Sequence, residues 1–425
     1  MIRSTRGKTL ASALPKDIPK VKEEIKASLP LLRAADIRRL AIPYNEVLVA
    51  ELHEEGFHEA AEYFKFLFEL DEETRKTAGP DTLIWYKPRL ADNEQYVDRL
   101  RSVLLIFCQR TIPAADRTLA MIDTALFFQN LTWEWWWIAE TLYRSAFYIA
   151  KEIENDDKQI INILRFIYAR FLFFQMKNAQ TALEYIREAY QESRHKSWNA
   201  SDIVGFEQES LFNESCALLH QVLLQIARQT RDCDVQTSID SCRVALNASN
   251  ESGHDELVAE VEYEFGKSEF TAGNIEEAIT HFINSLNAYE QIHDAQGTCT
   301  VHAELVNAYK QIGNKDIILR HLEEMTNIAS KFQLQQKLAE AYYLTAEYYL
   351  SRANLKEAIP SAEYAFSLYN RLGLRIQANS ARCLVGVTKG KDITDAYKVL
   401  IKRSVEGDAD AILKICQWRD RGELF

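Results

Sequence analysis

KQIGNKDIILRHL, at 310–322, has one related copy before it, FTAGNIEEAITHF at 270–282, and another after it, LSRANLKEAIPSA at 350–362. Each copy carries a two-residue turn signal between two helical runs, and the three signals are Gly273-Asn274, Gly313-Asn314 and Ala353-Asn354. Their spacing is constant, since 313 − 273 = 40 and 353 − 313 = 40. Asparagine suits these points because its side chain bonds local backbone groups where one helix ends and the next begins. Self-similarity at a fixed period of this size is typical of stacked helical repeats.

The same turn recurs outside these three copies, at Lys177-Asn178, at Cys233-Asp234 and, in a looser form, at Lys391-Asp392. The step from Lys177 to Cys233 is longer than one period, because 233 − 177 = 56, which exceeds 40 by 16. This excess matches the segment from Arg194 to Phe206, which we predict to be an ordered loop on one rim of the repeat array.

The residues after each turn also follow a pattern. Five residues on, most copies have a small side chain, at Ala182, Ser238, Ala278, Ala358 and Ala396, with Ile318 as the exception. Nine residues on, the side chain is usually apolar, as at Ile186, Phe282, Leu322 and Leu400. A small residue lets two antiparallel helices approach closely, and the larger side chain one turn later fills the space beside it. The pattern resembles the tetratricopeptide motif, lengthened from its usual size of about 34 residues by longer connections between hairpins.

The sequence therefore predicts an all-α protein, a tetratricopeptide-like solenoid of helical hairpins wound into a right-handed superhelix. We expect a flexible basic tail at residues 1–30 and divergent helical hairpins at 31–155. The repeats should occupy 156–404, with the rim loop near 194–206, and a C-terminal helix and tail should follow at 405–425.

Composition favours the same fold and excludes several classes of partner. Glycine and proline are scarce, at 14 and 8 residues, and the apolar share is 47%. The net charge of −12 opposes binding to nucleic acid. Seven scattered cysteines without a Cys-x-x-Cys pair indicate reduced thiols. The most apolar segment, Ala125 to Ala150, contains Glu134, Glu140 and Arg144, so we expect no membrane insertion.

No pattern of residues indicates an active site. The segment from Gly386 to Asp392 comes nearest to a phosphate-binding loop, but it has one residue too few between its glycines and an aspartate where a metal-binding hydroxyl belongs. We interpret it as a turn between helices. The prediction is a non-enzymatic protein with no catalytic residue, metal or cofactor.

Two sets of residues are candidates for binding a protein partner. If the first helix of each hairpin lines the concave surface, that surface should include Tyr263, Lys267, Phe270, Asn307, Lys310, Tyr343 and Glu347. Each of these is alternatively an ordinary surface residue, and Glu347 opposes capture of a terminal carboxylate, which weakens a co-chaperone interpretation. The second set is Trp133, Trp135, Trp136 and Trp137, which must cover opposite faces of a helix and serve either packing or a partner.

Four stretches outside the repeats resemble the tetratricopeptide repeat protein 29 family. They are Glu55 to His58, Leu83 to Pro88, Lys196 to Asn199 and Gln417 to Gly422. Their order and the repeats between them extend the resemblance over roughly Ile42 to Gly422. Four residues in these stretches match family landmarks, either as partner contacts or as packing for loops: Trp85, Pro88, Trp198 and Trp418.

The resemblance implies a scaffold or adaptor of the axoneme in motile cilia and sperm flagella, in the cytoplasm and cytoskeleton. Its implied roles are axoneme assembly, flagellar beating and sperm motility, through dynein-arm or intraflagellar-transport components. The alternative is a cytosolic peptide-binding adaptor or assembly chaperone for axonemal dynein. The basic tail, Arg3 to Lys22, has a charge suited to contact with an acidic microtubule surface.

Overall fold

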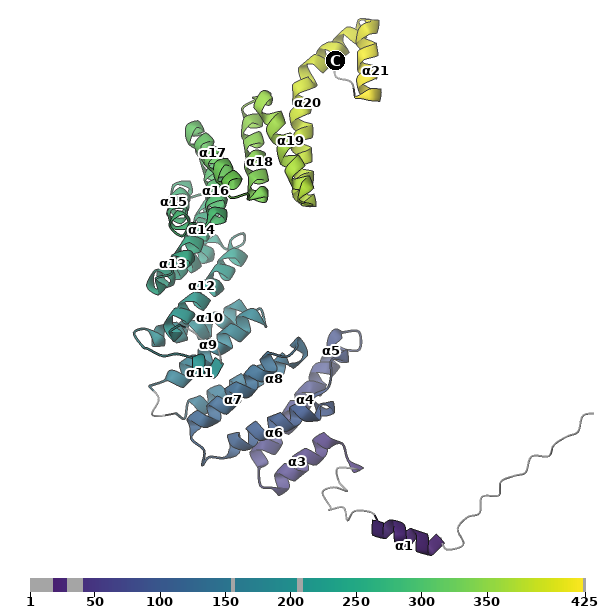
Figure 1. Cartoon of the computed structure of the whole chain (residues 1–425), viewed down its shortest axis with the longest axis vertical. Helices are drawn as coiled ribbons and strands as arrows, with labels where there is room; N and C mark the ends of the chain where they lie inside the picture. The colour runs from purple at the N-terminus through teal and green to yellow at the C-terminus, as the bar shows by residue number, and fades with distance from the viewer. Residues whose placement is uncertain (1–17, 29–40, 154–156, 205–208, 423–425) are drawn as a thin grey trace, which may run out of the picture. The chain divides into compact units, whose positions relative to one another are not determined.

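The computed structural model describes residues 18–28, 41–153, 157–204 and 209–422 (Figure 1). In these ranges the regular elements are α-helices and two short 3₁₀ helices, without a β-strand. The chain divides into two compact units, Met1–Ile160 and Ile161–Phe425. The corresponding boundary predicted from the sequence lies between residues 155 and 156.

The described part of the first unit is helical. Its helices are α1 (Ile18–Ser28), α3 (Tyr44–Glu54), α4 (His58–Ala78), α5 (Leu83–Tyr86), η1 (Leu90–Asp92), α6 (Glu94–Cys108), α7 (Ala114–Gln129), η2 (Trp133–Trp135) and α8 (Trp136–Ala150). Contacts run from α3 to α4, from α4 to α6, and on through α7 to α8. Helix α1 falls inside the segment predicted to be a flexible tail. That prediction is wrong for Ile18–Ser28, because the strong helix formers of VKEEIKAS favour a helix there. Residues 1–17 lie outside the described ranges.

The second unit contains the repeats. Its helices are α9 (Gln159–Phe174), α10 (Ala179–Ser193), α11 (Ser201–Val204), α12 (Leu211–Thr230), α13 (Val235–Ser252), α14 (Asp255–Ala272), α15 (Ile275–Gln291), α16 (Ala295–Ile312), α17 (Lys315–Lys331), α18 (Gln335–Ser351), α19 (Leu355–Arg371), α20 (Arg375–Val405) and α21 (Ala409–Arg421). From α12 onward each helix packs against the next (Figure 1). Helices α12, α14, α16, α18 and α20 also contact one another in order. These first helices of the hairpins form one continuous row, called the inner row below, and the predicted tetratricopeptide-like fold is confirmed.

The predicted turns within hairpins lie where the helices end. Gly273 and Gly313 adopt the left-handed conformation, with φ of 88° and 86°, and Ala353 adopts it with φ of 56°. Glycine has no Cβ and enters this region without strain. The asparagine after each of them is the N-cap of the following helix, and the Asn314 side chain accepts a hydrogen bond from the backbone N–H of Ile317.

A second series of turns connects one hairpin to the next. Gly253, His293, Gln333 and Gly373 all have positive φ and follow one another at the same period of 40. The connections are therefore as short as the turns inside the hairpins, and the predicted longer connections are wrong. The repeat is longer than the usual motif because its helices are longer: α14 to α19 each have 17 or 18 residues.

The turn predicted at Lys391-Asp392 is wrong, and so is the turn predicted over Gly386 to Asp392. Helix α20 continues through both as one helix of 31 residues. A glycine inside a helix costs only about 1 kcal/mol, and no residue of α20 has the positive φ that the true turns have. Helix α21 packs against α20 instead and closes the unit.

Two further expectations concern aromatic residues. Trp135 is 4% exposed and Trp133 is 45% exposed, so the tryptophan cluster does divide between the core and the surface. In the rim segment, Trp198 is 9% exposed and its carbonyl accepts a hydrogen bond from the backbone N–H of Leu211. The rim segment is described up to Val204, and Phe206 lies outside the described ranges.

Candidate partner-binding face

The concave residues predicted from the sequence lie on three neighbouring helices of the inner row. Tyr263, Lys267 and Phe270 belong to α14, Asn307 and Lys310 to α16, and Tyr343 and Glu347 to α18. Polar contacts link these helices across the row. Phe270 does not take part in them and packs instead against the apolar cluster around Phe282.

One residue that the sequence analysis missed, Glu304 on α16, connects the first part of this row. Its carboxylate accepts a hydrogen bond from the Tyr263 hydroxyl at 3.4 Å and one from the Asn307 amide at 3.3 Å. Further along, the Lys310 ammonium lies 3.5 Å from the Glu347 carboxylate. The inner row therefore carries a chain of exchangeable polar contacts from α14 to α18.

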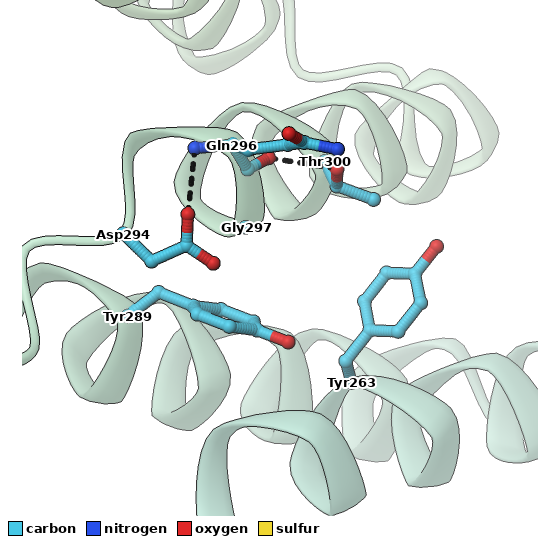
Figure 2. Close-up of a pocket in the computed structure, with 6 residues that line it drawn as sticks. All are labelled: Tyr263, Tyr289, Asp294, Gln296, Gly297 and Thr300. Carbon is cyan, nitrogen blue, oxygen red and sulfur yellow. Dashed lines mark hydrogen bonds between the residues drawn. The ribbon is translucent and has the colours of Figure 1, made fainter. Parts of the chain in front are cut away.

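A hollow of about 260 Å³ opens beside Tyr263, between α14, α15 and α16 (Figure 2). It is lined by Tyr263, Tyr289, Asp294, Gln296, Gly297 and Thr300. One carboxylate oxygen of Asp294 accepts a hydrogen bond from the Gln296 backbone N–H at 2.9 Å and so caps α16. Figure 2 shows the other oxygen turned toward the hollow, with the Tyr289 ring below it and the Tyr263 ring facing it across the space. We call this space the first hollow.

Gly297 makes this arrangement possible. A Cβ at position 297 would lie far inside van der Waals contact with the Tyr289 ring. Tyr289 can therefore lie flat against α16 only because this position has no side chain.

A second hollow, of about 470 Å³, lies between α18, α19 and α20. It is lined by Gln336, Lys337, Glu340, Tyr343, Leu344, Tyr369, Ile376, Gln377 and Ser380. The predicted residue Tyr343 stands on its wall, and Tyr369 is a lining residue that the sequence analysis missed. Lys337 and Glu340 form an ion pair at 2.9 Å on the same wall.

The tyrosines of both hollows stay neutral at physiological pH. Burial, together with the charges of Glu260, Asp294 and Glu264, raises the pKa of Tyr289 to about 12. Burial is also the main reason why the pKa values of Tyr263 and Tyr369 lie above their ordinary range. Each hydroxyl therefore keeps its proton and can donate a hydrogen bond.

Other landmark residues make contacts within the chain. Trp85 is 40% exposed, but its carbonyl accepts a hydrogen bond from the Arg75 guanidinium at 2.9 Å, which holds the connection after α4. The Pro88 carbonyl accepts a hydrogen bond from the same guanidinium at 2.8 Å. Trp418 on α21 lies with its ring centre 5.2 Å from that of Tyr397 on α20. The contacts of Trp85 and Pro88 are made by backbone carbonyls, so the role of their side chains, in packing or in partner contact, stays a prediction.

A histidine pair lies behind the inner row, between α16 and α17. The Nδ1 atoms of His302 and His321 are 3.0 Å apart, so one ring must donate to the other and the two cannot both carry a proton there. Burial first, and then the charge of His321, lowers the pKa of His302 from 6.5 to about 4. The unfolded chain consequently binds more protons than the folded chain between pH 4 and 6.5.

We expect this pair to make the second unit sensitive to mild acid. Its contribution to the free energy of unfolding is complete above pH 6.5 and is lost as the pH falls from 6.5 toward 4. The free energy of unfolding measured with urea should therefore be about 2 kcal/mol lower at pH 5 than at pH 7.5 because of this pair. In a His302→Gln variant the difference should shrink by that amount, while His254→Gln, at a histidine whose side chain is 43% exposed, should retain it. An unchanged difference in His302→Gln would contradict the assignment.

Within the described ranges, no cluster of three or more His, Cys, Asp or Glu side chains has the arrangement to hold a metal ion. None of the helices described there combines the length and apolar character needed to cross a bilayer.

No protein-family model matches the sequence, and no curated protein matches it. Solved structures with a similar arrangement include the apo form of RapI, at 14% identity and a TM-score of 0.36, covering 64% of this chain and 98% of that chain. Aspartyl phosphate phosphatase F from Bacillus subtilis has 14% identity and a TM-score of 0.35, and the match covers 85% of this chain and 96% of that chain. A signal transduction ATPase with a tetratricopeptide repeat sensor from Pyrococcus horikoshii has 12% identity and a TM-score of 0.38. That match covers 72% of this chain and 49% of that chain. At these values the likeness identifies neither a family nor an activity.

Proposed function

We propose that this protein is a non-enzymatic adaptor that holds an extended segment of a partner protein along the inner row. The observation that carries the proposal is the continuity of this surface. Two tyrosine-lined hollows and a chain of polar contacts lie on successive first helices, from α14 to α20. Such a surface offers side-chain pockets together with exchangeable hydrogen bonds, as recognition of a peptide segment requires.

The proposal assigns the protein to the axoneme of motile cilia and sperm flagella, with a dynein-arm or intraflagellar-transport component as the partner. This part is supported by the four sequence stretches described above and by their order along the chain. The cytosolic alternative, an assembly chaperone for axonemal dynein, differs in where the protein resides.

Fractionation of flagella separates these two roles. A tagged full-length chain in sperm-producing tissue should remain with the axoneme after the flagella are stripped with detergent. Complete release, or confinement to the cell body, would contradict the axonemal role and favour cytosolic assembly.

The binding face has its own test. A photo-crosslinking amino acid placed at Lys267, on the inner row, should give crosslinks that map to one segment of a single partner. The same group at Glu277, exposed on α15, is the control and should give none. Crosslinking from Glu277 alone would place the binding face elsewhere.

A further inference from the structure

The two hollows occupy equivalent positions two repeats apart. Adding 80, which is twice the repeat period, to residue numbers of the first hollow gives residues of the second. The pairs are Tyr263 and Tyr343, Tyr289 and Tyr369, Gln296 and Ile376, Gly297 and Gln377, and Thr300 and Ser380. Two tyrosines at equivalent positions thus line a hollow twice within the second unit.

The repeat between them lacks the feature. Its equivalents of the two tyrosines are Ala303 and Ala329, which are 5% and 0% exposed. Because alanine stands at both positions, this middle repeat has no aromatic wall. The repeats on either side of it have the tyrosine hollow. A single partner segment that follows the inner row would meet two such hollows in succession.

The carboxylates of Glu260 and Glu264, whose charges act on Tyr289, are neutralised by the Arg228 guanidinium at 2.7 Å each. The carboxylate in the lining of the first hollow is that of Asp294. Lys267 lies with its ammonium 5.3 Å from the centre of the Tyr263 ring, so this aromatic wall already accepts a cation. On the other side, Asp294 presents a carboxylate oxygen to the hollow above the Tyr289 ring (Figure 2). An aromatic face beside a carboxylate is the setting that favours a guanidinium or ammonium group.

The second hollow differs in charge. The carboxylate in its lining, that of Glu340, is already neutralised, because it pairs with the Lys337 ammonium at 2.9 Å. Ile376 stands at its edge with 80% of its surface exposed, in the place that Gln296 has in the first hollow. An exposed isoleucine beside tyrosine rings favours an apolar side chain.

From these differences we infer that one partner segment places a basic side chain, arginine or lysine, in the first hollow and an apolar side chain in the second. This inference rests on the proposed function and specifies the chemistry of its partner. The spacing of the two hollows sets a fixed number of residues between the two side chains.

Selection from a random dodecapeptide library displayed on phage tests it on the full-length chain. Enriched peptides should share one basic and one apolar residue at constant spacing. Asp294→Asn removes the charge but keeps an oxygen to accept from Gln296, and it should weaken their binding about tenfold, equivalent to about 1.4 kcal/mol. The matched control is Glu277→Gln, which removes an exposed charge from α15 and should change nothing.

The second hollow is tested by Ile376→Asp, which should also weaken binding about tenfold. Its control is Val405→Asp, because Val405 is 83% exposed at the far end of the same helix. Peptides that compete with the crosslink from Lys267 yet ignore both hollow variants would overturn the inference and leave the proposed function standing. If no peptide is enriched, or if the enriched ones do not compete with that crosslink, both are contradicted.

Discussion

Replacing Asp71 by alanine should destabilise the first unit by about 3 to 5 kcal/mol, because it leaves two buried cations without their counter-charge. The Asp71 carboxylate lies 2.9 Å from the Lys87 ammonium and 3.5 Å from the Arg75 guanidinium, and all three side chains are 4 or 5% exposed. It also accepts a hydrogen bond from the backbone N–H of Leu90 at 3.1 Å. We expect the loss to appear in urea unfolding of the full-length chain.

The effect should be local as well as large. Arg75 donates to the carbonyls of Trp85, Lys87 and Pro88, so the whole connection from α4 to α6 depends on its position. In Asp71→Ala, hydrogen exchange should accelerate first in residues 83–90.

The neighbouring Glu72 supplies the control for this experiment. Its ion pair with Arg89 is 3.5 Å long, and both side chains are about half exposed, so Glu72→Ala should cost less than about 1 kcal/mol. A cost for Asp71→Ala no greater than that of Glu72→Ala would show that the buried cluster does not stabilise the connection.

The repeats could be predicted from the sequence because their turns carry residues with a specific backbone role. Gly273 and Gly313 occupy left-handed positions, and an asparagine follows each as an N-cap. The second series of turns was missed because only Gly253 and Gly373 are glycines, whereas His293 and Gln333 occupy the left-handed positions between them and interrupt the pattern. Packing of the flanking helices imposes a conformation there that these residue types do not favour by themselves.

The error at Lys391-Asp392 has the opposite cause. The local residues resemble a turn, but helix α20 gains more from uninterrupted backbone hydrogen bonds than it loses at Gly386 and Gly390. Only the positions of α19 and α21 against it distinguish a turn from a long helix, and a local pattern does not contain that information.

The candidate site was predicted in part. The first-helix residues followed from the constant register of the repeats, and the structure places them on one row. Tyr289, Asp294 and Tyr369 come from second helices and connections, and they reach the hollows only because these helices are 17 residues long. The recurrence of tyrosine at twice the repeat period was a signal for Tyr289 and Tyr369, whereas the equivalent of Asp294 is Leu374 and no such signal exists for it.

Phe282→Ala should be the most damaging truncation in the repeats, with a cost of about 3 to 5 kcal/mol. Phe282 is 1% exposed and fills the seam between α14 and α15. On the facing helix, a Cβ at Gly266 would lie 2.6 Å from its ring, so Gly266→Ala should also destabilise, by about 1 to 3 kcal/mol. A truncation at Ile283, the next residue but 40% exposed, should cost much less.

The double variant shows whether these two residues form one packing unit. If the phenyl ring is what excludes a side chain at position 266, then Gly266→Ala should cost little once Phe282 is alanine, and the double-mutant coupling should be at least about 1 kcal/mol. Urea unfolding of the wild type, both single variants and the double variant measures this coupling. Additive costs would mean that the close approach of α14 and α15 is set by other contacts along the seam. A coupling of the expected size would show that Gly266 and Phe282 together fix the separation of the two helices, and with it the position of Tyr263 at the wall of the first hollow.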